Sequence, residues 1–214
     1  MIGVIDYGMG NLHSVTKAME RLELEYFLSE DIQELKKADG LILPGVGSFK
    51  DAMTILEAKG QAGFVKEWAE DGKPLLGICL GMQLLFEGSE ENGETEGLNL
   101  LPGYVRRFSG VMEDGTKYKV PHMGWNNVSF QQPDHPLLQS LNTGHVYFVH
   151  SYVVRTDDES VLIATSEYDG PVPAVVGRDN VMGTQFHPEK SSQMGMTILK
   201  NFGALVAGKV SANE

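Results

Sequence analysis

The sequence predicts an α/β fold, namely a single-domain, doubly wound, mostly parallel sheet flanked by helices, with additional antiparallel strands in the C-terminal half. Up to about residue 86, short apolar runs alternate with segments of helical periodicity, as in repeated βαβ units. From about residue 103 to 186 the chain is rich in short strand-like runs, which favours antiparallel pairing. The 214 residues, of which 42% are hydrophobic, suffice for one sizeable core, so we expect one domain over residues 1–214.

The N-terminal half supplies the parallel part of this sheet. Each expected strand is a short apolar run, and each expected helix repeats apolar residues at intervals of three or four. We expect strands at 1–5, 25–28, 40–43 and 75–78, and helices at 11–22, 31–37, 50–58, 61–71 and 80–86.

The C-terminal half is expected to be mixed and partly antiparallel. Its strands are expected at 104–108, 117–121, 128–130, 146–149, 152–155, 161–165, 174–178 and 181–186. A last helix at 193–206 places four apolar side chains on one face, which are Met194, Ile198, Phe202 and Leu205. Doubly wound sheets bind ligands outside the carboxyl ends of their strands, so residues that follow strands are the candidates for a site.

The charge balance and the lengths of the apolar runs limit the class of partner. The chain has 17 Lys and Arg residues against 29 Asp and Glu residues, and this net charge of −12 would repel nucleic acid. No apolar run reaches membrane-spanning length, and the opening residues lack the pattern of a signal peptide. The single cysteine excludes an internal disulfide. We therefore expect a cytoplasmic protein with no nucleic-acid or membrane partner.

The only cysteine, Cys79, follows an apolar run bounded by Pro74 and precedes a segment of helical periodicity. The thiol would stand at a helix N-terminus, where the helix dipole favours the thiolate. Gly77 and Gly81 leave room for a tight turn, as in the Gly-x-Ser-x-Gly elbow of hydrolases. A lone cysteine after an apolar strand is more often a small buried hydrophobe, so both interpretations stay open at this point.

A second segment, Gly183-Thr-Gln-Phe-His-Pro-Glu189, favours the nucleophile. In extended chain, side chains two residues apart share a face, so His187 and Glu189 would point the same way. The histidine could then take the thiol proton while the carboxylate holds the other ring nitrogen. We therefore interpret Cys79, His187 and Glu189 as a cysteine acyl-transfer triad.

A third segment, Gly40-Leu-Ile-Leu-Pro-Gly-Val-Gly-Ser-Phe49, is an apolar strand that runs into a glycine-rich loop. Glycines let backbone N–H groups approach a ligand closely, and two such donors can bind the oxyanion of a tetrahedral intermediate. We expect one donor near Val46 and Gly47 and the other at the amide of Leu80. Standing alone, the loop would suit an ordinary strand-to-helix turn equally well.

Together these segments resemble the class I, triad-type glutamine amidotransferases, whose nucleophile elbow, Pro-Gly-x-Gly loop and His-Pro-Glu segment they match over nearly the whole chain. More narrowly, four motifs resemble the glutaminase subunits of imidazole glycerol phosphate synthase. They are Asp6-Tyr-Gly-Met-Gly-Asn-Leu12, Pro44-Gly-Val-Gly-Ser-Phe49, Pro121-His-Met-Gly-Trp-Asn126 and His187-Pro-Glu-Lys-Ser-Ser192. Glutaminases paired with anthranilate or aminodeoxychorismate synthases share the triad but are not expected to carry the third motif or the Lys-Ser-Ser after the glutamate.

The resemblance implies hydrolysis of L-glutamine to glutamate and ammonia through a thioester on Cys79. The ammonia would pass to a cyclase subunit, the partner in a heterodimer, which makes imidazole glycerol phosphate and an aminoimidazole carboxamide ribonucleotide in histidine biosynthesis. The glutamine-binding residues that it implies are Gly45, Gln83, Glu91, His150, Ser151 and Tyr152.

The segment 121–126 is expected to be a loop with an apolar, aromatic centre, a composition typical of the centre of a protein interface. With the resemblance, we place Asn11, Trp125 and Lys190 at the contact with the cyclase. Lys190 directly follows the triad glutamate, so it could couple docking to the active site. We also expect docking to switch hydrolysis on by reorienting the peptide near Val46, which has glycine on both sides.

Other interpretations stay open. The chain could be a glutaminase serving a chorismate-using or pyridoxal phosphate-forming synthase, a non-catalytic binding module on the same fold, or a cysteine peptidase. No cofactor is expected, because Gly8-Met-Gly10 lacks the third glycine of a dinucleotide fingerprint. No metal is expected either, because the histidines lack companions at metal-ligand spacing.

Overall fold

The computed structural model of the chain describes residues 1–168 and 170–208. The strands of its larger sheet are β1 (Ile2–Ile5), β2 (Tyr26–Ser29), β3 (Gly40–Gly45), β4 (Leu75–Cys79), β8 (His122–Phe130), β9 (Gly144–His150), β11 (Leu162–Glu167), β12 (Pro171–Arg178) and β13 (Val181–Thr184). The helices are α1 (Leu12–Arg21), α2 (Ile32–Leu35), α3 (Phe49–Ala58), α4 (Gln61–Glu70), α5 (Leu80–Leu84) and α6 (Ser192–Val206). Short 3-10 turns lie at Pro136–Leu138, Glu159–Val161 and Pro188–Lys190.

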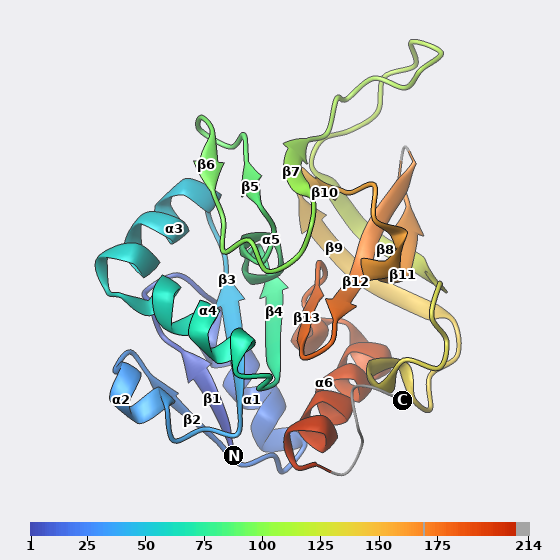
Figure 1. Cartoon of the computed structure of the whole chain (residues 1–214). Coiled ribbons are helices and arrows are strands. Elements are labelled where there is room, and N and C mark those ends of the chain that lie inside the picture. The colour runs from blue at the N-terminus through green and yellow to red at the C-terminus, as the bar shows by residue number, and fades with distance from the viewer. Residues whose placement is uncertain (169, 209–214) are drawn as a thin grey trace.

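The larger sheet has nine strands in the order β2-β1-β3-β4-β13-β12-β11-β8-β9 (Figure 1). Strands β2, β1, β3, β4 and β13 pair in parallel. From β13 onward, β12, β11, β8 and β9 extend the sheet in antiparallel pairs. The expected α/β class is confirmed, with its parallel strands built mainly from the N-terminal half and its antiparallel strands from the C-terminal half.

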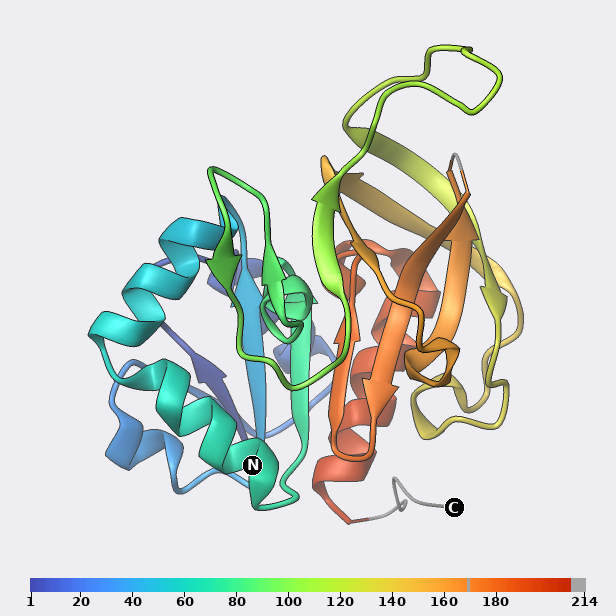
Figure 2. The same ribbon diagram turned by 45° about the horizontal axis from the view of Figure 1, so that its top comes forward.

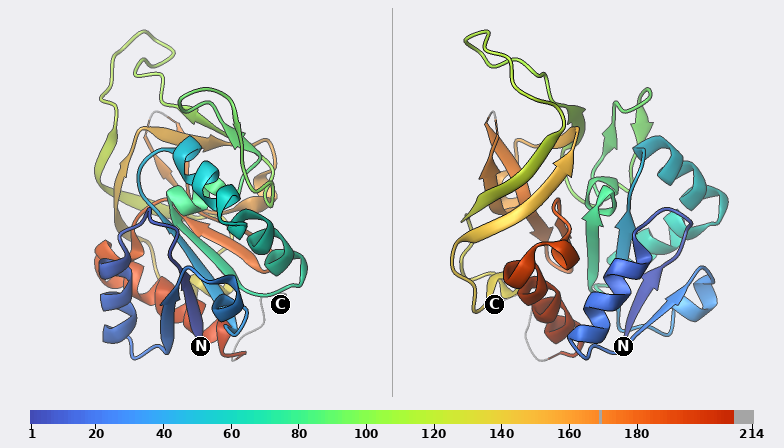
Figure 3. Two further views of the ribbon diagram at one scale, coloured as in Figure 1. Left: turned by 90° about the vertical axis from the view of Figure 1, so that its left-hand side faces the viewer. Right: turned by 180° about the vertical axis from the view of Figure 1, so that it is seen from behind.

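Helices cover both faces of this sheet, and each face has its own hydrophobic core. Helices α3 and α4 lie on one face, whereas α1 and α6 lie on the other (Figures 1 and 3). Side chains alternate along β3, so Leu41 and Leu43 join the first core while Ile42 joins the second. Both cores hold large, fully buried aromatic side chains, such as Trp68 in the first and Phe202 in the second.

Side-chain caps fix where the helices beside the site begin. The Oδ1 atom of Asn11 accepts a hydrogen bond from the Ser14 N–H at the start of α1 (3.4 Å). The Oγ atom of Ser48 accepts one from the Asp51 N–H at the start of α3 (3.2 Å). Such caps satisfy N–H groups that have no partner within the helix. The Ser48 cap therefore marks the end of the glycine-rich loop that follows β3.

A second, four-stranded sheet in the order β10-β7-β5-β6 lies at the end of the molecule where β3 and β4 terminate (Figure 2). Its strands are β5 (Gly88–Ser89), β6 (Thr95–Glu96), β7 (Tyr104–Arg107) and β10 (Tyr152–Arg155). The strands β5 and β6 are only two residues long. They fall in residues 87–96, which we call the acidic loop, so they carry no hydrophobic pattern that predicts a strand. Between β7 and β8 the chain projects from this end as a long arm.

Two expected elements in the C-terminal half were wrong, and a third is shorter than expected. The segment 117–121 is not a strand, because it lies in the projecting arm and makes only an isolated bridge, between Lys117 and Val111. The segment 121–126 is not a loop, because β8 runs from residue 122 and pairs along β9. The expected strand at 181–186 ends at Thr184, and the chain then bends into the turn Pro188–Lys190.

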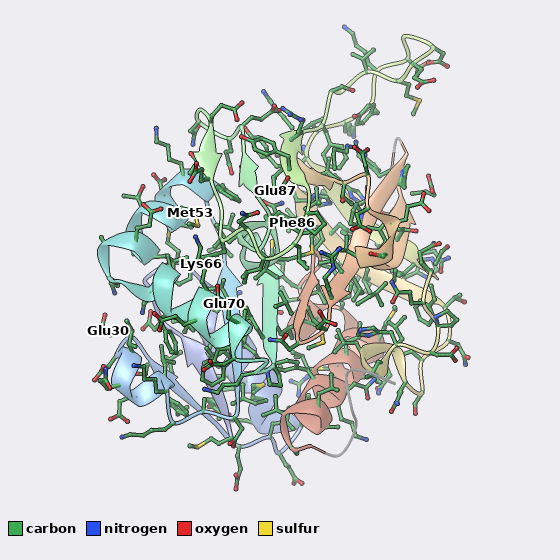
Figure 4. All side chains as sticks on the ribbon, viewed as in Figure 1. Glu30, Met53, Lys66, Glu70, Phe86 and Glu87 are labelled. Carbon is green, nitrogen blue, oxygen red and sulfur yellow. The ribbon has the colours of Figure 1, made fainter. Side chains whose placement is uncertain are left out.

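Acidic side chains are spread over the outside of the fold, as Glu30 and Glu70 show (Figure 4). Some form exposed ion pairs, such as Glu30 with Lys59 at 2.8 Å, a type of contact that adds little stability. Within the described ranges, no helix is both long and apolar enough to cross a membrane.

Candidate active site

Cys79 ends β4 and caps α5, so its thiol stands on a sharp strand-to-helix turn. The backbone has φ 55° and ψ −113°, and such a sparsely populated conformation costs a non-glycine residue roughly 1–3 kcal/mol. A Cβ atom on Gly81 would lie 1.8 Å from the carbonyl oxygen of Leu43, and one on Gly77 would lie 2.6 Å from that of Gly81. Glycine at 81 therefore lets the turn pack closely against β3, and glycine at 77 lets the turn close on itself. The turn thus has the geometry expected of the elbow, although α5 ends at Leu84 rather than near residue 86.

His187 and Glu189 meet across a tight turn. The Nδ1 atom of His187 is 2.9 Å from Oε1 of Glu189, and both side chains are almost completely buried. The contact was expected, but its backbone explanation was wrong, because residues Pro188–Lys190 form a 3-10 turn rather than extended chain. The Oγ atom of Ser191 donates to the carbonyl oxygen of His187 at 2.7 Å and closes this turn.

The surroundings of His187 favour its protonated form. Burial by itself would lower the pKa of the imidazole, because it disfavours the cation. Hydrogen bonding and charge attraction to Cys79 and to Glu189 outweigh burial and raise the pKa of His187 to about 10. The contacts of His187 with the sulfur and the carboxylate therefore favour the imidazolium form at neutral pH. This arrangement can supply both a nucleophile and a proton donor.

The glycine-rich loop lies beside Cys79 because β3 and β4 are paired in parallel up to their last residues, Gly45 and Cys79. The hydroxyl of Tyr7 donates to the carbonyl oxygen of Pro44 at 2.9 Å and ties down the start of the loop. Gly47 has φ +98°, a conformation that L-residues rarely adopt. Val46, between the two glycines, is 40% exposed. The loop is thus anchored at Pro44 and open to solvent at Val46.

A cavity of ≈ 360 Å³ joins these groups. It is lined by Val46, Gly47, Cys79, Leu80, Gln83, Glu91, Pro121, Val149, His150, Ser151, Tyr152 and His187. Of the predicted glutamine-binding residues, only Gly45 is missing from the lining, because it lies beneath the loop, where an added Cβ would be 2.7 Å from the Tyr7 hydroxyl. A larger hollow of ≈ 1040 Å³ beside β7, β10 and β12 contains none of the predicted site residues.

Two of the lining side chains have anchored hydrogen-bonding groups. The Nε2 atom of Gln83 donates to the carbonyl oxygen of Tyr152 (3.1 Å) and to Oε1 of Gln185 (3.0 Å). The Oε2 atom of Glu91 accepts from the N–H of Phe49 at 2.9 Å. Burial raises the pKa of Glu91, partly offset by this hydrogen bond, and the nearby Asp51 charge raises it further.

His150 belongs to a buried network that joins the cavity wall to β8. Its Nδ1 atom is 2.7 Å from the carbonyl oxygen of Tyr152, and its Nε2 atom is 2.9 Å from Nδ1 of His122. The other ring nitrogen of His122 is 3.0 Å from Oδ1 of Asn126. Burial lowers the pKa of His150 to about 4, partly offset by the hydrogen bond to Tyr152 and reinforced by His122. His150 therefore contributes a neutral ring at neutral pH.

Sequence reasoning missed two residues next to Cys79. Tyr7 lies under the glycine-rich loop, and burial, followed by the nearby sulfur of Cys79, raises the pKa of its hydroxyl, which keeps it protonated. Gln185 is 1% exposed, and its Nε2 atom is 4.0 Å from the Cys79 sulfur. The first lies within the motif 6–12 and the second within 183–189, so motif membership was the only available signal.

The three predicted interface residues lie on connected elements. Trp125 is 53% exposed and belongs to an apolar surface that we call the outer β8–β9 face, made of Met123, Trp125, Tyr147 and Val149. The N–H of Tyr147 donates to Oγ of Ser191, next to the exposed Lys190. The turn Pro188–Lys190 in turn contacts α1, which Asn11 caps.

Among the described residues, no group of three or more His, Cys, Asp and Glu side chains is placed to hold a metal ion.

Comparison with known proteins relates the fold and the chain to glutamine amidotransferases. The family "Glutamine amidotransferase class-I" matches residues 3–205. The imidazole glycerol phosphate synthase subunit HisH of Halalkalibacterium halodurans is 66% identical, with 99% of each chain covered. The subunit of the same name from Bacillus subtilis is 55% identical, with 97% of each chain covered. A crystal structure of a glutamine amidotransferase superposes with a TM-score of 0.73 at 22% identity, covering 97% of this chain and 98% of that one, which shows the shared fold.

Proposed function

The chain belongs to the class-I glutamine amidotransferases, and we propose that it is the glutaminase subunit of imidazole glycerol phosphate synthase, a cytoplasmic enzyme of histidine biosynthesis. We propose further that it works as one domain over residues 1–214. The observation that carries the proposal is that Cys79 and His187 line one cavity of ≈ 360 Å³, while Glu189 lies 2.9 Å from Nδ1 of His187. The relatives named for this subunit support the choice among class-I enzymes.

In the first half of the reaction, the Cys79 sulfur attacks the carboxamide carbon of glutamine. A C–S bond forms, and the carbonyl electrons move onto oxygen to give a tetrahedral oxyanion. Collapse of this intermediate breaks the C–N bond, and the imidazolium of His187 gives its proton to the departing nitrogen, which leaves as ammonia. The raised pKa of His187, about 10 in the free site, favours the protonated form that the reaction starts from at neutral pH.

In the second half, water hydrolyses the thioester. Neutral His187 takes a proton from the water, whose oxygen attacks the thioester carbon, and breaking of the C–S bond returns the sulfur to Cys79 and releases glutamate. Glu189 orients the ring through its contact with Nδ1 and stabilises the imidazolium that forms again. For both tetrahedral oxyanions, the donors would be the amide of Leu80 and an N–H near Val46 and Gly47.

Glutamine would lie in the cavity with its carboxamide at Cys79. Glu91 is placed to pair with the substrate ammonium, because its carboxylate lines the cavity while Phe49 holds one oxygen. Gln83 has its Nε2 atom engaged by Tyr152 and Gln185, so its carbonyl oxygen is the group for a substrate N–H. The segment 150–152 completes the wall.

The ammonia is useful only if a partner receives it before it is protonated by solvent. We propose a heterodimer with the cyclase subunit, docked on the outer β8–β9 face with Asn11 and Lys190 at the same contact. Met123, Trp125 and Val149 are exposed there beside the partly buried Tyr147, and such an apolar surface suits an interface. Docking would reorient the exposed peptide near Val46 into an oxyanion donor.

The rate of glutamine hydrolysis, measured with the chain alone, with the cyclase, and with the cyclase and its nucleotide ligand, tests this function. We expect slow hydrolysis by the isolated chain and a large increase with both partners. Equal rates under all three conditions would exclude the switching role of docking.

Labelling with a glutamine-analogue electrophile tests the chemistry independently of the partner's product. We expect the label on Cys79 by peptide mass spectrometry, in competition with glutamine. An unlabelled Cys79 in the complete complex would refute the glutaminase proposal. Labelling without any stimulation by this cyclase would indicate a glutaminase for another synthase.

A further inference from the structure

Gln185 lies between the end of β13 and His187, buried against the sulfur of Cys79. Its backbone N–H donates to the carbonyl oxygen of Ala174 at 2.9 Å, so the residue is held by β12. Its side chain is in contact with Gln83 on one side and Cys79 on the other. The mechanism above gives it no role, although it is only 1% exposed and next to the nucleophile.

The orientation of the Gln185 amide follows from the hydrogen bonds that join it, through Gln83, to the backbone carbonyl oxygen of Tyr152. The carbonyl oxygen of Tyr152 can only accept, so the atom of Gln83 that lies 3.1 Å from it must be the NH₂ group. The same NH₂ group is 3.0 Å from Gln185, which must therefore present its oxygen there. The NH₂ group of Gln185 is left to face the Cys79 sulfur at 4.0 Å.

We propose that Gln185 is a positioning residue for the nucleophile. Its side-chain NH₂ group donates a hydrogen bond to the Cys79 sulfur, which also interacts with His187. A charged thiolate accepts such a bond more strongly than a neutral thiol or a thioester sulfur does. The contact therefore favours the thiolate before attack, and favours it again as the leaving group when water hydrolyses the thioester. It also couples the nucleophile to Gln83, the proposed substrate-binding residue.

This role of Gln185 rests on the proposed function only where it concerns the rate of glutamine turnover. Its first test therefore measures alkylation of Cys79, which does not require that function. Cys79 is the only cysteine, and intact-mass measurement of iodoacetamide addition to the full chain therefore reports its reactivity alone. We expect Gln185→Leu to slow alkylation near pH 7 on the order of tenfold, and the rate to converge with that of the unmodified chain at high pH.

Gln185→Glu separates this role from simple filling of space. The glutamate keeps an acceptor for Gln83 but turns an acceptor toward the sulfur, so we expect alkylation near pH 7 at least as slow as in Gln185→Leu. A merely structural role predicts that the near-isosteric glutamate restores the rate. The control is Gln131→Leu, which removes the amide of an exposed glutamine bonded to the buried Thr165 at 3.0 Å, outside the cavity lining.

The test compares the alkylation rate of each chain as a function of pH. The proposal is overturned if the curves of both Gln185 variants superpose on that of the unmodified chain, or if both lie below it by the same factor at every pH. Urea unfolding of each variant shows whether it is folded, and if Gln185→Leu does not fold, Gln185→Glu alone decides. Because alkylation needs neither glutamine nor cyclase, a chain that fails the glutaminase test can still support or refute the role of Gln185.

Discussion

The carboxylate of Glu91 accepts a hydrogen bond of 2.9 Å from the backbone N–H of Phe49, the first residue of α3. This bond ties the acidic loop to the segment directly after the glycine-rich loop. It also leaves the carboxylate half-buried in the cavity wall, where burial raises its pKa. One residue thus connects the proposed ammonium site to the proposed oxyanion loop.

Glu91→Gln should weaken glutamine binding more than catalysis. The amide oxygen can still accept from Phe49, but the charge that pairs with the substrate ammonium is lost. We expect KM for glutamine to rise on the order of tenfold, with kcat changed less. Steady-state kinetics of the cyclase complex measure both constants. An unchanged KM would remove Glu91 from the binding site.

Tyr7→Phe should loosen the glycine-rich loop. It removes the hydroxyl that bonds the Pro44 carbonyl oxygen, and leaving this buried acceptor unpaired costs about 1–3 kcal/mol. We expect a lower free energy of unfolding in urea and a lower kcat with little change in KM. A variant with normal kcat would show that the Tyr7 bond does not control the oxyanion donors.

Stability should fall at alkaline pH because His187 keeps its proton in the folded state. The unfolded chain releases this proton near its ordinary value of 6.5, whereas the folded chain keeps it to about 10. The stabilising contribution is therefore fully present below pH 6.5 and is lost as the pH rises through about 10. Urea unfolding between these values should show the decline, and His187→Gln should flatten it. An equal decline in both proteins would contradict the assignment.

Gly81→Ala should prevent correct folding of the elbow. Its Cβ would meet the Leu43 carbonyl oxygen at 1.8 Å, and relieving that overlap requires backbone movement at a cost of roughly 3 kcal/mol or more. Gly63→Ala in α4 is the matched control, because nothing lies within 4 Å of its added Cβ. The control should gain about 0.5–1 kcal/mol. Thermal unfolding of both variants measures the difference.

Trp125→Ala should weaken docking of the cyclase without changing hydrolysis by the isolated chain. Exposed aromatic residues at the centre of an interface often cost 2 kcal/mol or more when truncated, so we expect an affinity loss on the order of thirtyfold or more. Leu28→Ala is the control, since Leu28 is 43% exposed on β2, at the opposite edge of the sheet. Calorimetric titration with the cyclase compares them. Equal losses would exclude the outer β8–β9 face as the docking surface.

The N-terminal half of the fold could be predicted closely because three of its four strands, β1, β3 and β4, are buried on both faces. β1, β3 and β4 are continuous apolar runs, and their expected bounds differ from the observed ones by at most two residues. In β8, by contrast, the large apolar side chains Met123 and Trp125 are exposed and point away from the core. The apolar residues of this strand therefore do not mark its buried face, and the sequence pattern indicated a loop.

The candidate triad could be predicted because its chemistry is local in sequence. Cys79 follows a strand and lies between close glycines, and His187 and Glu189 are two residues apart. Their contact depends on a 3-10 turn that the pattern did not indicate. The sequence pattern therefore indicated which side chains form the candidate triad, but not the backbone that joins them.

Only the tertiary structure decided how those side chains are held. The register places Gly45 beside Cys79. This pairing joins segments far apart in the chain, as do the contacts of Tyr7 with Pro44 and of Gln185 with Cys79. Local propensity and hydrophobic periodicity describe residues that are close in sequence, so they do not indicate which distant residues will be in contact. The sequence alone determined the residue types and the order of the parallel elements along the chain, whereas the anchoring of Cys79 arose when the strands packed side by side.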